Sequence, residues 1–216
     1  MRIGVLGTGT VGRTLGTALV AAGHHVAMGS RTADNETAAA WAEPLGSRHG
    51  TYADAAEGAD VLVNATPGTH SVEVLRAAGA DQLYGVVVLD VSNSLDTSSG
   101  SPRLADTGGT SVAEQLQQTF PQLRVVKSLN TVNASVMVDP AKVPGAHTVF
   151  VAGDDADAKG VVRGLLGAFG WPEGSVLDLG GLSAAAGLEA YVLFWVATWQ
   201  ALGDPVFNIA VVRGHG

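Results

Sequence analysis

A glycine-rich turn near the start of the chain has the residue types and spacing to hold a dinucleotide. The turn follows an apolar run, residues 2–6, and precedes a helical pattern. It matches Gly-x-Gly-x-x-Gly with Gly7, Thr8, Gly9, Thr10, Val11 and Gly12. The first glycine of such a turn permits a tight bend, the second lets a pyrophosphate approach the backbone, and the third allows close packing of helix and strand. The context favours a dinucleotide site over a chance glycine turn.

The end of the second apolar run indicates which dinucleotide is bound. Domains selective for NAD usually place a carboxylate there to bind the ribose 2′-hydroxyl. This chain has Ser30, Arg31 and Thr32 instead, and its first carboxylate after the run is Asp34. A guanidinium can bind a 2′-phosphate through two parallel hydrogen bonds and stack on adenine, and the two hydroxyls add donors. The pattern predicts NADP rather than NAD; an ordinary surface arginine is the alternative.

A third segment stands where a nicotinamide would lie. Residues 64–67 follow another apolar run, and ligands of open parallel sheets bind beyond the carboxyl ends of the strands. We therefore expect Ala65, Thr66 and Pro67 to line the nicotinamide ribose. The segment also fits the start of a proline-capped helix, and both interpretations can hold together.

Short apolar runs alternate with helical stretches, which is typical of α/β proteins. Predicted strands occupy 2–6, 25–28, 60–65, 86–90, 124–126, 147–152 and 176–179, and 48–51 is a strand or loop. Predicted helices occupy 11–22, 37–41, 53–58, 69–78, 111–120, 156–169 and 183–202. We expect a Rossmann-type, doubly wound, mostly parallel sheet with a small C-terminal α/β extension that ends in a long apolar helix. Residues 1–150 would bind NADP and 151–216 would form the extension, whereas 91–109 is polar and predicted to be irregular.

The composition of the chain limits its partners. Its 216 residues carry a net charge of −8, which argues against nucleic-acid and membrane-surface binding. With no cysteine and no ligand spacing among the histidines, no metal site is predicted. The apolar stretch 190–201 is shorter than the ~20 residues of a membrane span, which favours a buried or dimer-forming helix. A cytoplasmic protein is expected.

Five segments together resemble a known family. They are residues 1–32, the turn 64–67, Val126-Lys127-Ser128-Leu129-Asn130-Thr131, Phe150-Val151-Ala152-Gly153-Asp154-Asp155, and Leu177-Asp178-Leu179-Gly180 before the last helix. The sequence resembles the NADP oxidoreductase, coenzyme F420-dependent family over essentially its full length. The glycine turn is shared by many NADP proteins, and the segments at 129–131 and 153–155 are more specific.

The resemblance implies an oxidoreductase that transfers a hydride between NADP(H) and a deazaflavin, coenzyme F420, as second substrate. Such a reaction needs placement and exclusion of water more than acid–base groups, so no catalytic side chain is assigned. By position, the NADP phosphates would be held by Thr8, Thr10, Val11, Ser30, Arg31 and Thr32. The second ring would face Ser92, Asn93, Asn130 and Thr131. The apolar last helix suggests a homodimer.

One position departs from part of the family and keeps other functions open. Archaeal members have histidine where this chain has Asn130, and many bacterial relatives have asparagine. One alternative keeps NADPH but reduces another acceptor, such as a flavin, an imine or a metal chelate. A further alternative is a non-catalytic protein that binds NADP as a sensor.

Overall fold

The computed structural model describes residues 1–96, 98, 100, 102–105 and 107–214, and in this part of the chain eight strands form one sheet. The strands are β1 (Arg2–Leu6), β2 (His25–Ser30), β3 (Arg48–Thr51), β4 (Val61–Asn64), β5 (Val87–Asp90), β8 (Arg124–Ser128), β9 (Val149–Ala152) and β10 (Val176–Asp178). They lie in the order β10-β9-β8-β5-β4-β1-β2-β3, and neighbours are parallel except β8 and β9. The prediction of a Rossmann-type, mostly parallel sheet is confirmed.

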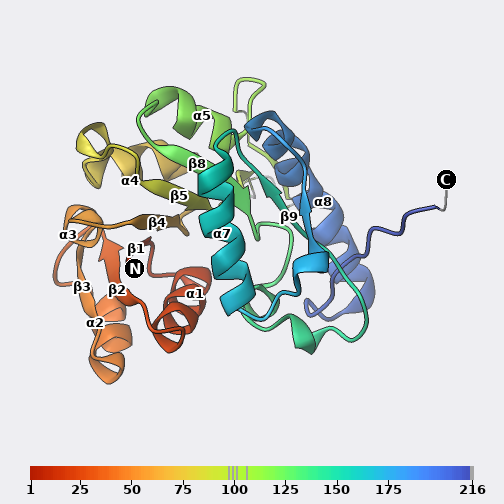
Figure 1. Cartoon of the computed structure of the whole chain (residues 1–216), viewed down its shortest axis with the longest axis horizontal. Helices are drawn as coiled ribbons and strands as arrows, with labels where there is room; N and C mark the ends of the chain where they lie inside the picture. The colour runs from red at the N-terminus through yellow and green to blue at the C-terminus, as the bar shows by residue number, and fades with distance from the viewer. Residues whose placement is uncertain (97, 99, 101, 106, 215–216) are drawn as a thin grey trace.

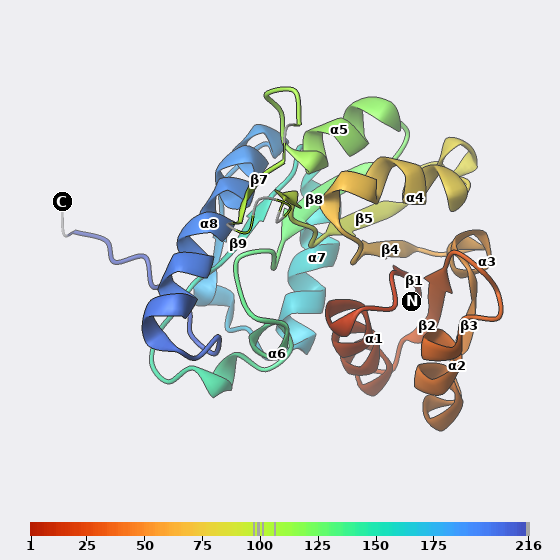
Figure 2. The same ribbon diagram turned by 180° about the vertical axis from the view of Figure 1, so that it is seen from behind.

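Helices cover both faces of the sheet, as Figure 1 and Figure 2 show from opposite sides. One apolar core contains side chains of α1 (Thr10–Ala21), α2 (Glu36–Ala42), α6 (Ala134–Met137) and α7 (Ala156–Ala168). The other contains side chains of α3 (Tyr52–Ala56), α4 (Ser71–Ala77), α5 (Val112–Thr119) and the start of α8 (Ala185–Leu202). Because β1, β4 and β5 are buried under both layers, their sequences are nearly continuous apolar runs.

The sheet order brings several segments of the chain to one edge. The connections after β1 and β4 diverge to opposite faces, which creates the crevice where open α/β sheets bind ligands. The glycine turn follows β1, residues 64–67 follow β4, and the segment from Ser92 follows β5. All three therefore meet beyond the carboxyl ends of the central strands.

Two parts of the chain differ from the sequence prediction. Residues 91–109 are not wholly irregular, because β6 (Leu95–Asp96) and β7 (Arg103–Leu104) pair as short antiparallel strands. Residues 97, 99, 101 and 106 of this predicted loop lie outside the described residues. Between β8 and β9 lies α6, a short helix that the apolar pattern does not predict. Both strands of the predicted extension join the main sheet, with residue 150 inside β9, and the division into 1–150 and 151–216 stays a prediction.

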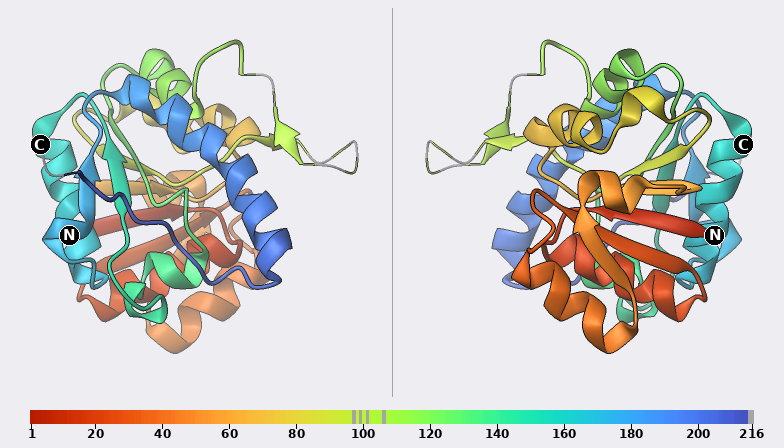
Figure 3. Two further views of the ribbon diagram at one scale, coloured as in Figure 1. Left: turned by 90° about the vertical axis from the view of Figure 1, so that its right-hand side faces the viewer. Right: turned by 90° about the vertical axis from the view of Figure 1, so that its left-hand side faces the viewer.

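The last helix is longer than its most apolar stretch suggested. With its leading turn it spans Leu182–Leu202, 21 residues, and by length and composition it could cross a membrane. The length argument made on residues 190–201 therefore does not extend to the whole helix. Figure 3 shows α8 lying diagonally across one side of the molecule. Only 28 % of its most apolar stretch is buried within the chain, so much apolar surface stays uncovered.

Candidate functional site

The glycine turn has the geometry that a pyrophosphate needs. Gly7 has a φ of 116°, and a Cβ atom there would lie 2.6 Å from the carbonyl oxygen of Ala65. A Cβ atom at Gly12 would lie 2.1 Å from the carbonyl oxygen of Gly7, so α1 can approach β1 only because residue 12 lacks a side chain. At Gly9 a Cβ atom would meet no described atom within 4 Å. The backbone of Gly9 therefore borders open space at the N-terminus of α1, where an anion is favoured.

A cavity of about 620 Å³ extends from this turn to the end of β2. Eight of the residues predicted to bind the cofactor line it: Gly7, Thr8, Gly9, Ser30, Arg31, Ala65, Thr66 and Pro67. Thr10, Val11, Gly12 and Thr32 are not among its lining residues. The cavity is large enough for a nucleotide-sized ligand.

Arg31 lines this cavity directly after the end of β2, with its side chain exposed. Within the described part of the chain it forms no ion pair with a carboxylate, so its guanidinium is available to an anionic ligand. The hydroxyl of Ser30 is buried and donates to the carbonyl oxygen of Thr32 at 2.5 Å. Ser30 therefore shapes the turn that presents Arg31, in addition to lining the cavity.

The cavity also has lining residues that the sequence analysis did not assign to the cofactor: Asn35, Tyr52, His70, Glu73, Val74 and Ala77. Burial raises the pKa of Tyr52 above its ordinary value, and the nearby charge of Arg31 lowers it by a smaller amount. The phenol is therefore neutral at physiological pH and can donate a hydrogen bond. His70 is exposed at the start of α4, 3.6 Å from the carboxylate of Glu73. His70 lies close in sequence to the predicted nicotinamide turn, whereas no glycine pattern or strand end marks the other positions. The start of α2 brings Asn35 to the cavity, and α3 and α4 bring the rest.

The four residues predicted to face a second ring lie together at the adjoining strand ends. Asn93 and Asn130 are joined by two hydrogen bonds of 2.9 Å. Asn93 Nδ2 donates to the backbone carbonyl oxygen of Asn130, and Asn130 Nδ2 donates to Asn93 Oδ1. Ser92 and Thr131 are buried beside them. Among the described residues, Ser92 Oγ, Asn130 Oδ1 and Thr131 Oγ1 are buried and have no hydrogen-bond partner. Such atoms are rare in folded proteins, and a polar ligand or an ordered water bound to these three would account for them.

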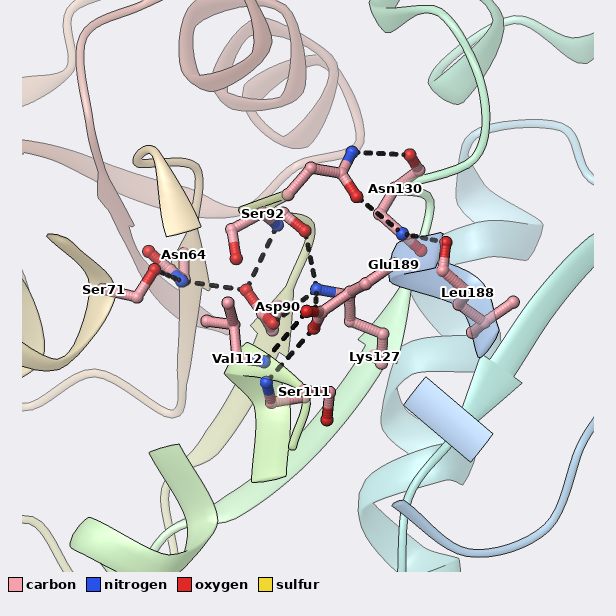
Figure 4. A network of polar contacts seen from close by, with 12 residues as sticks. Asn64, Ser71, Asp90, Ser92, Ser111, Val112, Lys127, Asn130, Leu188 and Glu189 are labelled. Carbon is pink, nitrogen blue, oxygen red and sulfur yellow. Dashed lines mark hydrogen bonds and ion pairs between the residues drawn. The ribbon is translucent and has the colours of Figure 1, made fainter. Parts of the chain in front are cut away.

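Beneath these residues lies a buried ionic network, drawn in Figure 4. The ammonium of Lys127 lies 2.8 Å from the carboxylate of Asp90 and 2.8 Å from that of Glu189, and all three side chains are almost completely buried. Lys127 also donates to the carbonyl oxygen of Ser92 at 2.6 Å. Asp90 accepts from the Asn64 side chain at 2.8 Å, which links the network to β4. The sequence analysis missed this network.

Within the described residues, no three or more His, Asp or Glu side chains lie close enough together to hold a metal ion. Among the described residues, the site thus consists of a glycine turn, an exposed arginine and a polar floor, the name used here for Ser92, Asn93, Asn130 and Thr131. With the strand order, these features define a dinucleotide-binding protein of the Rossmann class.

Comparison with known proteins gives the family. Residues 2–94 match the model of the family described as NADP oxidoreductase coenzyme F420-dependent. A solved structure of a candidate F420-dependent NADP reductase from Arthrobacter sp. FB24 is 43 % identical, covers 99 % of this chain and 100 % of its own, and has a TM-score of 0.91. The chain belongs to the family of F420-dependent NADP oxidoreductases, so it is an enzyme of the NADP-dependent oxidoreductase class.

One more distant relative and one solved structure of similar fold were also found. Metalloreductase STEAP3 of Rattus norvegicus is 30 % identical over 92 % of this chain, which spans only 38 % of that protein's length. A reductive aminase from Aspergillus terreus, solved in complex with NADPH and ethyl levulinate, is 20 % identical. The two structures superpose over 94 % of this chain and 62 % of the aminase chain with a TM-score of 0.63, which shows a similar fold and no more.

Proposed function

We propose that this protein transfers a hydride between NADP(H) and a deazaflavin of the coenzyme F420 type. The observation that carries the proposal is the end-to-end match, at 43 % identity, to the candidate F420-dependent NADP reductase. Two features of the site support it: a cavity that joins an exposed Arg31 to the glycine turn, and a polar floor next to it.

Each group of residues has a separate role in this proposal. The amides of the glycine turn and the start of α1 bind the pyrophosphate, while Arg31 and Thr32 bind the 2′-phosphate. The turn at 65–67 holds the nicotinamide, which supplies the hydride when NADPH is bound. The unpartnered hydroxyls of Ser92 and Thr131 donate hydrogen bonds to carbonyl oxygens of the acceptor ring, and Asn130 Oδ1 accepts from its imide N–H. Stacked rings need only placement and exclusion of water, so a site without an acid–base dyad suits this reaction.

A second candidate keeps NADPH and changes the acceptor to a flavin, an imine or a metal chelate. The likeness to the rat metalloreductase favours a metal chelate among these acceptors, since that relative is 30 % identical over most of this chain. A non-catalytic NADP sensor is the third candidate and would bind NADPH without turnover. The net charge of −8 supports a small-molecule substrate rather than nucleic acid, and we propose that the protein acts in the cytoplasm, away from membranes.

Turnover with coenzyme F420 tests the reaction directly. Purified protein, NADPH and oxidised F420 should give loss of the deazaflavin absorbance at about 1–1,000 turnovers per second, the range of ordinary enzymes. Parallel reactions contain FMN, a cyclic imine or ferric citrate as the acceptor. Turnover with one of these and none with F420 would establish the second candidate, and NADPH binding without any turnover would establish the sensor.

We also propose that α8 pairs with α8 of a second copy to form a homodimer. Phe194, Trp199 and Leu202 are exposed by 58 %, 42 % and 60 %, and the helix is apolar on all sides. A self-complementary face of this kind closes with two-fold symmetry.

Light scattering after gel filtration measures the oligomeric state. The expected mass is twice that of the 21.9 kDa chain, and Phe194→Glu combined with Trp199→Glu should reduce it to that of one chain. Tyr84→Glu is the matched control, because Tyr84 is an exposed apolar residue (78 %) that lies outside α8. A wild-type mass of one chain, or a dimer that survives both glutamates, would contradict the proposal.

A further inference from the structure

We infer that the buried network of Lys127, Asp90 and Glu189 fixes the distance between the cofactor and the acceptor, and that Lys127 is a positioning residue for hydride transfer. The inference rests on the proposed function and extends it to residues that touch neither ring. Hydride transfer between stacked rings is sensitive to their separation, and a misplacement of about 1 Å can lower the rate about 100-fold. Residues that hold the predicted nicotinamide turn and the acceptor-side residues at a fixed separation therefore influence the rate of hydride transfer.

Lys127 is the point where the connections meet. Its ammonium has three oxygen partners, from the end of β5, from the segment that follows β5 and from α8: Asp90 Oδ2 at 2.8 Å, the Ser92 carbonyl at 2.6 Å and Glu189 Oε1 at 2.8 Å. An ammonium donates three hydrogen bonds, so this set saturates it. The lysine side chain is completely buried. Among its partners, Asp90 is the last residue of β5 and Ser92 is one of the residues predicted to face the second ring.

One arm of the network leads to the cofactor. The other oxygen of Asp90 accepts from Asn64 Nδ2 at 2.8 Å, and the same amide lies 2.8 Å from the hydroxyl of Ser71 on α4. Asn64 Oδ1 accepts in turn from the hydroxyl of Thr66 at 2.6 Å. Thr66 lines the cofactor cavity within the predicted nicotinamide turn. Lys127 is thus two side chains, Asp90 and Asn64, away from that turn.

The second arm leads to the acceptor residues through α8. Glu189 accepts from the backbone N–H groups of Val112 at 2.9 Å and Ala113 at 3.3 Å, so it also ties α8 to the start of α5. The preceding residue, Leu188, accepts through its carbonyl oxygen from Asn130 Nδ2 at 2.9 Å. Asn130 is paired with Asn93, and the carbonyl oxygen of Asn93 accepts from the N–H of Gly68 at 3.0 Å. Both arms therefore meet again across the site.

The backbone beside Lys127 is strained in a way that fits this role. Leu129 is buried and has a φ of 62°, the one left-handed residue other than glycine within the described part of the chain. It lies between Lys127 and Asn130 and turns the chain from β8 toward the acceptor side. Strained backbone persists where its surroundings over-determine it, and such sites are frequently functional. Apolar side chains of similar volume could replace a buried ion network without loss of stability, so stability alone does not account for the charges.

Variants of the network test the inference. Lys127→Met removes the ammonium at nearly constant length, and Glu189→Gln removes one charge while its amide oxygen can still accept from α5. We expect kcat for F420 reduction to fall about 10- to 100-fold in Lys127→Met and less in Glu189→Gln. The Kd for NADPH should stay within about twofold, because its phosphate contacts lie outside the network. The deuterium isotope effect from labelled NADPH should increase, since hydride transfer becomes rate-limiting.

Lys159→Met is the matched control. Lys159 also pairs with one carboxylate, Asp178 at 2.9 Å, and with one carbonyl, Gly180 at 3.2 Å, but it lies on α7 beside the edge strand. This variant should keep the wild-type kcat and isotope effect. If Lys127→Met does not fold, Glu189→Gln decides. Equal kcat and isotope effect in the wild type and in a folded network variant would overturn the inference.

A second readout separates this inference from the proposed function. Absence of turnover with F420 in the wild type would refute the proposed function alone. The fluorescence of bound NADPH then reports how firmly the nicotinamide is held at the Thr66 turn. Lys127→Met should lower that emission relative to wild type and Lys159→Met, whereas unchanged emission would overturn the inference independently of any acceptor.

Discussion

Arg31→Ala is expected to weaken NADPH about 10- to 100-fold while changing the affinity for NADH by less than about twofold. The difference corresponds to the loss of a charge-assisted pair, roughly 1.5–3 kcal/mol. Only NADPH carries the 2′-phosphate, so a guanidinium that binds this group affects one cofactor and not the other. Its side chain is exposed beside the cofactor cavity and no ion pair with another described residue competes for it. Titration of both reduced cofactors by their fluorescence measures the two constants.

Arg48→Ala is the matched control for this result. Arg48 is also exposed, by 69 %, but it is the first residue of β3 and so lies at the amino ends of the strands, away from the cavity. Its guanidinium is 3.7 Å from the carboxylate of Glu57. Its loss should leave both affinities unchanged. Salt should weaken NADPH binding more in the wild type than in Arg31→Ala, because screening acts on the charge pair. Equal weakening of NADPH and NADH by Arg31→Ala would contradict the 2′-phosphate role.

Much of the fold follows from local patterns in the sequence. The central strands are buried on both faces, so they stand out as continuous apolar runs such as 2–6 and 86–90, and the glycine turn fixes the first βαβ unit. The reversal at β9 has no such signal. It depends on α6 and the turn after it, and a helix of four residues is too short to show a helical period.

The parts of the candidate site that lie on one continuous segment could be predicted from the sequence, whereas the network that joins several segments could not. The glycine turn and the residues after β2 are contiguous, so their chemistry is visible in the sequence. The network needs β5, β8 and α8 in register: Asp90 stands directly opposite Lys127, but only the strand pairing reveals this. Two polar residues at the ends of apolar runs are the signal that could have found that pair. Glu189 is a single charged residue inside a long apolar helix, and nothing in the sequence indicates that its partner is Lys127.

The two glycines of the turn should respond in opposite ways to the same substitution. Gly12→Ala places a Cβ atom 2.1 Å from the carbonyl oxygen of Gly7, and backbone on both sides prevents relief. We expect a loss of about 3 kcal/mol or more in the free energy of unfolding, or about 6–12 °C in Tm. Gly9→Ala meets no described atom within 4 Å, and the φ of −70° and ψ of 179° at Gly9 suit alanine. Its stability should therefore change by less than about 0.5 kcal/mol.

Binding of NADPH completes the contrast. In Gly9→Ala the new methyl group occupies the space through which a pyrophosphate reaches the amides at the start of α1, so the Kd should rise more than about tenfold in a fully stable protein. Gly160→Ala is the control: it is exposed in α7, far from the turn, and should raise stability by about 0.5–1 kcal/mol without affecting the Kd. Thermal unfolding and NADPH titration measure both quantities. A Gly9→Ala protein that binds NADPH as tightly as the wild type would mean that the pyrophosphate lies elsewhere, because a Cβ atom at residue 9 has only the ligand to meet.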